Sequence, residues 1–252
     1  MAVAGSITAA RARIVLRLRP MAILMLLVGW WSVAGAVVVT DAAAPLKPEE
    51  IVARMTANNA ARAARLRAYR STRTYELDYH GLPSHKSASM VVSAAYDEGQ
   101  KKLTVVSEGG SKLLLDHVLR KILVREVEAN DRENLATTAL SPDNYEFTLL
   151  GMEEAEAGGN PCYAFRVKPR RRDNLLYQGK VWIDAQEFAL VRIQAKPAKN
   201  PSFWISETLI EHEYRNTSGF WLPATNRSTS KVRFGGRAVL TIHYGDYEVT
   251  AK

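Results

Sequence analysis

Cysteine is nearly absent from this chain of 252 residues, which holds only Cys162. An internal disulfide is therefore excluded, and the fold must be stabilised by an ordinary hydrophobic core. No cysteine stands directly after the apolar run near the N-terminus, so the processing of a bacterial lipoprotein is excluded as well. Residues 45–252 are enough for one domain, and no linker or internal repeat in them suggests two.

Motifs of catalysis are also missing. The sequence has no nucleophile elbow, no HExxH pair, no phosphate-binding loop and no dinucleotide fingerprint. His212 and Glu213 are adjacent, so on a strand they would point to opposite faces and could not share a metal. Cys162 is better explained as a small strand residue than as a nucleophile. We therefore expect no catalytic residue, no metal site and no cofactor, and a function other than catalysis.

Acidic residues are missing from the first forty positions, where Arg11, Arg13, Arg17 and Arg19 precede an apolar run. This run covers residues 21–39 and is followed by three alanines, 42–44. Basic, apolar and small residues in this order are typical of a secretory signal peptide, cleaved after Ala44 or, alternatively, after Ala36. Residues 1–44 are thus predicted to be a signal peptide, and residues 45–252 the folded domain.

The apolar run holds nineteen residues, just enough to span a bilayer, so an uncleaved membrane anchor is the alternative. The positive-inside rule then leaves residues 45–252 outside the cytoplasm in either case, and we expect a periplasmic protein. Removing residues 1–44 takes away four arginines and Asp41, which lowers the formal net charge from +8 to +5. This mild positive charge suits anionic headgroups or acidic partners, and nucleic acid is not an expected partner.

Two segments have the periodicity of helices. In residues 45–69, Ile51, Val52 and Met55, and later Ala60, Ala64 and Leu66, form one apolar face, with two glutamates in the first turn. A second helix is predicted from near Ser111 to near Asn130. Its apolar face is wide, so we expect it to lie against the concave face of a sheet.

Alternation of apolar and polar residues predicts strands in most of the remaining chain. Turn residues and short connections separate these strands, except across the central helix. A sheet of this size should curl strongly or close into a barrel. The expected fold is therefore α+β, with a large, strongly curved antiparallel sheet, an open or incomplete β-barrel, and helices on its concave face. The ten candidate strands are 69–80, 87–97, 101–108, 145–153, 162–169, 177–184, 187–194, 203–214, 220–230 and 237–249.

A strongly curved sheet covered by only two helices encloses more volume than a small domain needs, and such interiors tend to hold an apolar ligand. Alternation and helical spacing select ten residues as candidate cavity lining: Tyr75, Leu77, Tyr79, Met90, Val92, Leu115, Leu119, Ile122, Trp182 and Trp204.

The densest run of charge is KPRRRDN, residues 168–174. It is either an exposed strand end or a contact for anionic headgroups or an acidic partner, with Arg170, Arg171 and Arg172 as donors. The sequence leaves both alternatives open.

Three segments carry a resemblance to a known family. NYEFTLLGME (144–153), GKVWIDAQEFALVRIQ (179–194) and FWLPATNRS (220–228) are similar to the second half of the LolA-like outer-membrane lipoprotein-sorting proteins. The resemblance covers most of residues 46–250. It implies an unclosed barrel with helices forming a lid, and a cavity that carries the acyl chains of lipoproteins across the periplasm. The family's lid-closing arginine cannot be matched to a particular position in this chain.

The resemblance favours a monomeric carrier of acylated lipoproteins or lipids, with envelope membrane proteins as further partners. The alternative is an envelope sensor or adaptor that binds lipid or a protein partner without transport. Relatives of that second type are similar in fold and use the same cavity for sensing.

Overall fold

The computed structural model describes residues 46–82, 84–129, 132–155, 159–173, 175–200, 202–233 and 235–252. Contacts divide the chain into two units, Met1–Ala44 and Pro45–Lys252, and all described residues belong to the second. The predicted signal peptide lies outside the described residues.

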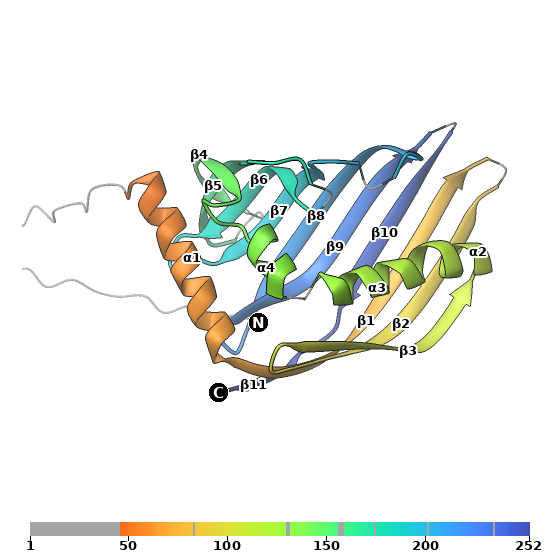
Figure 1. Cartoon of the computed structure of the whole chain (residues 1–252), viewed down its shortest axis with the longest axis horizontal. Coiled ribbons are helices and arrows are strands. Elements are labelled where there is room, and N and C mark those ends of the chain that lie inside the picture. Colours follow the sequence, from red (N-terminus) through yellow and green to blue (C-terminus); the bar gives the residue numbers. More distant parts are fainter. Residues whose placement is uncertain are drawn as a thin grey trace, which may run out of the picture. The chain divides into compact units, whose positions relative to one another are not determined.

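One antiparallel sheet of eleven strands dominates this unit (Figure 1). Its order is β3-β2-β1-β10-β9-β8-β7-β6-β5-β4, and β11 pairs with β1 beside this path. Strands β3 and β4 are the two edges, so the sheet does not close. The predicted fold class is confirmed. The strands are β1 (Leu66–Gly81), β2 (Lys86–Asp97), β3 (Gln100–Gly110), β4 (Tyr145–Glu154), β5 (Pro161–Pro169), β6 (Tyr177–Asp184), β7 (Leu190–Pro197), β8 (Ile205–Thr217), β9 (Phe220–Val232), β10 (Gly236–Tyr244) and β11 (Glu248–Ala251).

The last predicted strand, 237–249, is two strands in the structure. Strands β10 and β11 both pair with the 16-residue β1, one along each part of its length. Between them the chain passes close to β1, where the Gly245 N–H donates to the Thr72 carbonyl oxygen at 2.8 Å. A Cβ atom at Gly245 would lie 2.8 Å from the same oxygen, so this close approach requires glycine.

Helix α1 (Pro48–Arg65) begins with proline in its first turn, followed by Glu49 and Glu50, which favour a helix N-terminus. Ile51, Val52 and Met55 are buried, as predicted. The second half of α1 differs from the expectation, because Ala60 and Ala64 are exposed. The buried apolar residues of this helix all lie in its first half, whereas Arg62 and Arg65 of the second half contact Glu187 and Phe220.

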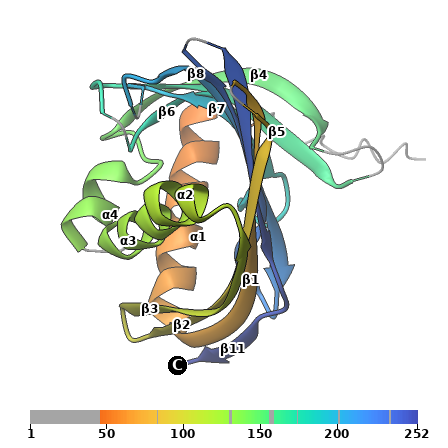
Figure 2. The ribbon, with the colours of Figure 1, turned by 90° about the vertical axis from the view of Figure 1, so that its right-hand side faces the viewer.

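The second predicted helix is a continuous helical segment with a π-helical turn inside it. It consists of α2 (Lys112–Leu114), the π-helical η1 (Leu115–Leu119) and α3 (Arg120–Glu128), and is followed by α4 (Arg132–Thr138). We call residues 112–128 the lid helix. In Figure 2 α1, the lid helix and α4 all lie on the same side of the sheet, the side on which the expectation places them.

Two separate hydrophobic cores join the helices to the sheet. In the first, the lid helix packs on β1, β2 and β10. In the second, the start of α1 packs on β4 to β7. The helices are thus held at opposite ends of the sheet's width, which leaves room between them.

Candidate ligand-binding site

Eight of the ten predicted lining residues come together in the core under the lid helix. Leu115 and Leu119 project from the π-helical turn onto the sheet, and Leu119 is fully buried. The others on the buried sheet face are Tyr75, Leu77, Met90 and Val92, and Tyr79 and Ile122 pack around the edge of the same cluster. A ligand would reach these side chains only if the lid helix moved away from the sheet.

Trp182 and Trp204, which were predicted to line the same cavity, do not join this cluster. Trp182 stands between Val181 and Ile183, which face α1 in the second core, so alternation directs the indole to the opposite face. There it packs in a third small cluster with Cys162 and Ala164. Trp204 is 59% exposed at one end of the sheet.

Two of the three arginines in the predicted basic contact, Arg170 to Arg172, already form hydrogen bonds within the domain. The Arg170 Nε donates to the Pro142 carbonyl oxygen at 2.8 Å, and the Arg171 guanidinium donates to Asn144 Oδ1 at 2.9 Å and to the Thr137 carbonyl oxygen. Both side chains therefore hold the connection between α4 and β4. Arg172 is exposed.

A buried ion cluster, which was not predicted, ties the lid helix to the sheet. Glu126 of α3 accepts from Arg73 Nη1 of β1, from Lys101 Nζ of β3 at 2.6 Å and from the Tyr75 hydroxyl at 2.8 Å. Arg73 is only 2% exposed, and the Glu126 side chain is 21% exposed. We call Arg73, Tyr75, Lys101 and Glu126 the lid cluster. One sequence signal could have found it: Arg73 lies two positions before Tyr75 and so shares its inward face.

The charges in the lid cluster stabilise one another against the effect of burial. Burial by itself would raise the pKa of Glu126, but Lys101 and Arg73 outweigh it and hold this pKa at about 2. Burial lowers the pKa of Lys101. Burial and the neighbouring Glu126 carboxylate raise the pKa of the Tyr75 hydroxyl. Glu126 is therefore ionised at neutral pH, and removing it would leave two cations without their counter-charge.

His212 lies on β8 within the same concave face. Its ring stacks on Tyr214 at 4.5 Å between centroids and faces Tyr244 at 6.3 Å. The buried Nε2 has no hydrogen-bond partner among the described residues. Burial lowers the pKa of His212 to about 4, so this imidazole is neutral at neutral pH.

The unfolded chain should bind a proton at His212 near pH 6.5, whereas the folded chain does so only near pH 4. The free energy of unfolding is therefore expected to decrease by roughly 2–3 kcal/mol as the pH falls through this interval. Chemical denaturation at a series of pH values, in the wild type and in His212→Gln, measures this contribution. His243→Gln, at a half-exposed histidine, is the control and should keep the full decrease. An unchanged pH profile in His212→Gln would contradict the assignment.

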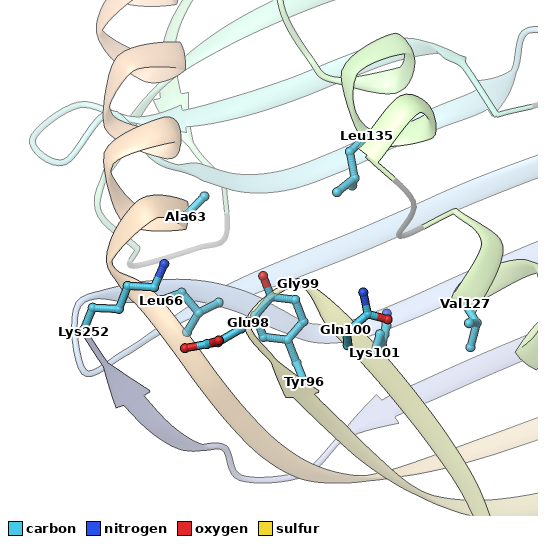
Figure 3. A pocket seen from close by; sticks show the side chains of 10 residues that line it. All are labelled: Ala63, Leu66, Tyr96, Glu98, Gly99, Gln100, Lys101, Val127, Leu135 and Lys252. Carbon is cyan, nitrogen blue, oxygen red and sulfur yellow. The ribbon is translucent and has the colours of Figure 1, made fainter.

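Two adjoining pockets lie beside α1, and the larger one borders the lid cluster at Lys101. The larger, about 560 Å³, is lined from α1, the β2–β3 turn, the lid helix, α4 and the C-terminus (Figure 3). The smaller, about 240 Å³, lies between α1 and the strands β7 to β9 and is mainly apolar. Ala63 and Leu66 line both pockets. The larger pocket combines apolar side chains and the Tyr96 ring with two cations, Lys101 and Lys252, and one carboxylate, Glu98.

Other kinds of site find no support in the part of the chain that the structure describes. Within it, no group of three histidine, cysteine or acidic side chains is placed to hold a metal ion. Its helices are all too short or too polar to cross a membrane.

Scans of family models and of curated proteins gave no match to this sequence. Among solved structures, one described as an outer membrane lipoprotein-sorting protein domain from Vibrio parahaemolyticus matches with a TM-score of 0.40 and 13% identity, over 80% of this chain and 91% of that one. A DUF1329 family protein from Desulfovibrio piger matches with a TM-score of 0.39 and 12% identity, over 80% of this chain and 91% of that one. A LolA superfamily protein from Nitrosomonas europaea matches with a TM-score of 0.35 and 12% identity, over 82% of this chain and 94% of that one.

These structures are similar to this chain with TM-scores of 0.40 or less and identities of 12–13%, so what those proteins bind is not transferred to this chain.

Proposed function

We propose that this protein binds an acylated lipoprotein or a free lipid between α1 and the lid helix, in the periplasm and without catalysing a reaction. The observation that carries the proposal is the pair of adjoining pockets beside α1, the larger of which borders the lid cluster. A volume of about 560 Å³ lies in the range of ligand sites. Because each buried methylene contributes about 0.8 kcal/mol, part of an acyl chain would already bind usefully.

The two pockets differ in a way that suits an amphipathic ligand. The smaller one, lined by Leu190, Phe220 and Leu222 among others, suits an acyl chain. The larger one adds two ammonium groups, that of Lys252 and that of Lys101, which also donates to Glu126. Despite the Glu98 carboxylate on the same wall, these two cations suit a phosphate or carboxylate group. A single molecule with an apolar tail and an anionic head would therefore match both pockets.

The lid cluster supports a closed, ligand-free arrangement. The leucines of the lid helix cover an apolar sheet face that could receive further acyl chain if the helix moved. Glu126 opposes this movement, because its three donors all come from the sheet. A ligand head that is negatively charged could take over contacts to Lys101 and compensate for its loss.

Substitutions on α1 test the site without disturbing the core. Ala63 is exposed and lines both pockets, so Ala63→Trp should fill the space they share. Ala61→Trp is the matched control, because Ala61 is also exposed on α1 and lines neither pocket. We expect Ala63→Trp to weaken the binding of a fluorescent acylated peptide at least tenfold, about 1.4 kcal/mol. The control should bind like the wild type.

Native mass spectrometry of the protein recovered from a periplasmic fraction, followed by lipid extraction, identifies the ligand class. A bound acylated species would support the proposal. A clean ligand-free mass, together with no uptake of acylated peptide, would reject it and favour a protein-binding adaptor.

The proposed location outside the cytoplasm has a separate test. The order of basic, apolar and small residues in 1–44 supports export. N-terminal sequencing of the mature protein should begin at Pro45 after cleavage behind Ala44. A sequence that begins within residues 1–20 would favour the uncleaved anchor.

A further inference from the structure

Large apolar side chains are exposed together at the end of the sheet where β1, β7 and β9 terminate. Leu82 follows β1 and is 76% exposed, and Phe203 and Trp204 precede β8 and are 67% and 59% exposed. Burial of such side chains is normally worth a few kcal/mol each, so their common exposure marks an interaction surface.

Hydrogen bonds join these turns into one continuous surface. The Tyr79 hydroxyl donates to the carbonyl oxygens of Leu82 at 2.9 Å and Gly235 at 3.2 Å, which links the β1–β2 and β9–β10 turns. The Arg233 N–H donates to the Trp204 carbonyl oxygen at 2.8 Å, which links the β9–β10 and β7–β8 turns. We call Leu82, Phe203, Trp204 and Arg233 the rim. The tips of these strands lie along the top and upper right of Figure 1.

The turns that carry the rim are basic, and the nearest acidic residues in sequence, Asp78 and Glu207, lie just outside them on β1 and β8. The three segments that form the rim, residues 79–88, 197–206 and 231–241, contain no aspartate or glutamate. The guanidinium carbon of Arg233 lies 4.7 Å from the centre of the Phe203 ring. Glu207, which follows on β8, is paired with both Lys196 and Lys231. The basic residues of the three segments are Lys86, Lys199, Lys231, Arg233 and Arg237.

We propose that the rim docks on an anionic lipid bilayer. Tryptophan favours the interfacial layer of a membrane, because its ring is largely apolar while its indole N–H is polar. Phenylalanine and leucine beside it bury in the boundary of the acyl chains. Lysine and arginine around them are attracted by anionic headgroups. An anionic membrane surface matches the basic turns of the rim, where Arg233, Arg237, Lys86 and Lys199 outnumber the flanking Asp78 and Glu207.

This docking is independent of the proposed ligand-binding site. Strand β1 starts at Leu66, which lines both pockets, and ends at Gly81, next to the rim. The two surfaces therefore lie at opposite ends of a 16-residue strand, and each can fail its test without the other. Docking by the rim would hold the pockets on the side of the domain that faces away from the bilayer.

A site-specific probe tests the proposal in the full chain, whose N-terminal apolar run could itself bind vesicles. An environment-sensitive fluorophore is attached to Leu82→Cys in a Cys162→Ala background. Vesicles rich in phosphatidylglycerol should shift its emission to shorter wavelength and make it accessible to a lipid-attached quencher. Phosphatidylcholine vesicles should do neither. The matched control is Met152→Cys, which is also well exposed, at 59% against 76% for Leu82, but lies near the opposite end of the sheet.

Rim variants then separate the apolar and the charged contributions. Phe203→Ser with Trp204→Ser should abolish the spectral shift at position 82, and Arg233→Gln should lower the apparent partition coefficient roughly fivefold. Lys102→Gln, an exposed lysine on β3 away from the rim, should leave it unchanged. The absence of any shift at position 82, or an equal shift at position 152, would overturn the proposal. A shift caused equally by both vesicle types would reject the electrostatic part of it.

Discussion

Glu126→Ala is expected to lower the free energy of unfolding by about 3–5 kcal/mol, a large share of the stability of an ordinary domain. The physical reason is that Arg73, which is 2% exposed, and the largely buried Lys101 would lose the carboxylate between them. Two buried cations would then face each other without compensation. The loss should therefore exceed what the deleted hydrogen bonds alone contribute.

Urea denaturation at neutral pH measures this loss, with Glu128→Ala as the matched control. Glu128 is exposed on the same helix, two positions further on, and its removal should cost within about 0.5 kcal/mol. The pKa of Glu126 is depressed to about 2, so its contribution is complete above about pH 4.5 and disappears as the pH falls towards 2. Wild type and Glu126→Ala should accordingly converge in acid. A constant difference between them across this interval would show that the effect is one of packing and not of charge.

Leu119→Ala is expected to destabilise the protein by about 2–5 kcal/mol, because it removes buried methylene groups and leaves a cavity between the lid helix and the sheet. Leu119 is fully buried, and it projects from the π-helical turn into the core formed with Tyr75 and Met90. This cavity lies where the lid helix would separate from the sheet. The variant should therefore also weaken the closure of the lid.

Hydrogen exchange distinguishes a general loss of stability from a weaker closure of the lid helix. The amides of the lid helix should exchange faster in Leu119→Ala than those of β5 and β6, which belong to the second core. Val124→Ala is the control, because Val124 lies on the same helical segment but is 57% exposed. Uniformly faster exchange in both cores would mean that the lid and the sheet unfold as one cooperative unit, and would contradict an independently moving lid.

The strands were predictable because their signal is local. Tyr75, Leu77 and Tyr79 alternate with polar residues, and the structure pairs this segment on both sides as the interior strand β1. The lid helix was predictable for the same reason, since its apolar residues recur with helical spacing. The division of the last segment at Gly245 was missed, because it depends on how closely that segment passes Thr72 of a strand far away in the sequence.

The site was predictable only in part. Alternation placed Tyr75 and Met90 on one face but could not decide which face of β6 turns inward. Trp182 was therefore predicted to line the cavity, whereas it packs with Cys162 and Ala164 on the other face of the sheet. Glu126 carried no local signal, because charged residues on an amphipathic helix usually face solvent. Its partner Arg73 is separated from it by 53 residues.

The sequence by itself determined the class of fold, most strand positions, the presence of a covering helix and the apolar residues beneath it. The elements follow from periodicity, which is visible in short stretches of chain. The need for an ordinary hydrophobic core follows from the single cysteine, which excludes an internal disulfide. Only the tertiary structure decided which charges meet, which tryptophans are buried, and that three distant turns form one rim. Such arrangements arise from register and curvature between strands, since a side chain's environment is set by residues that the linear order keeps far apart.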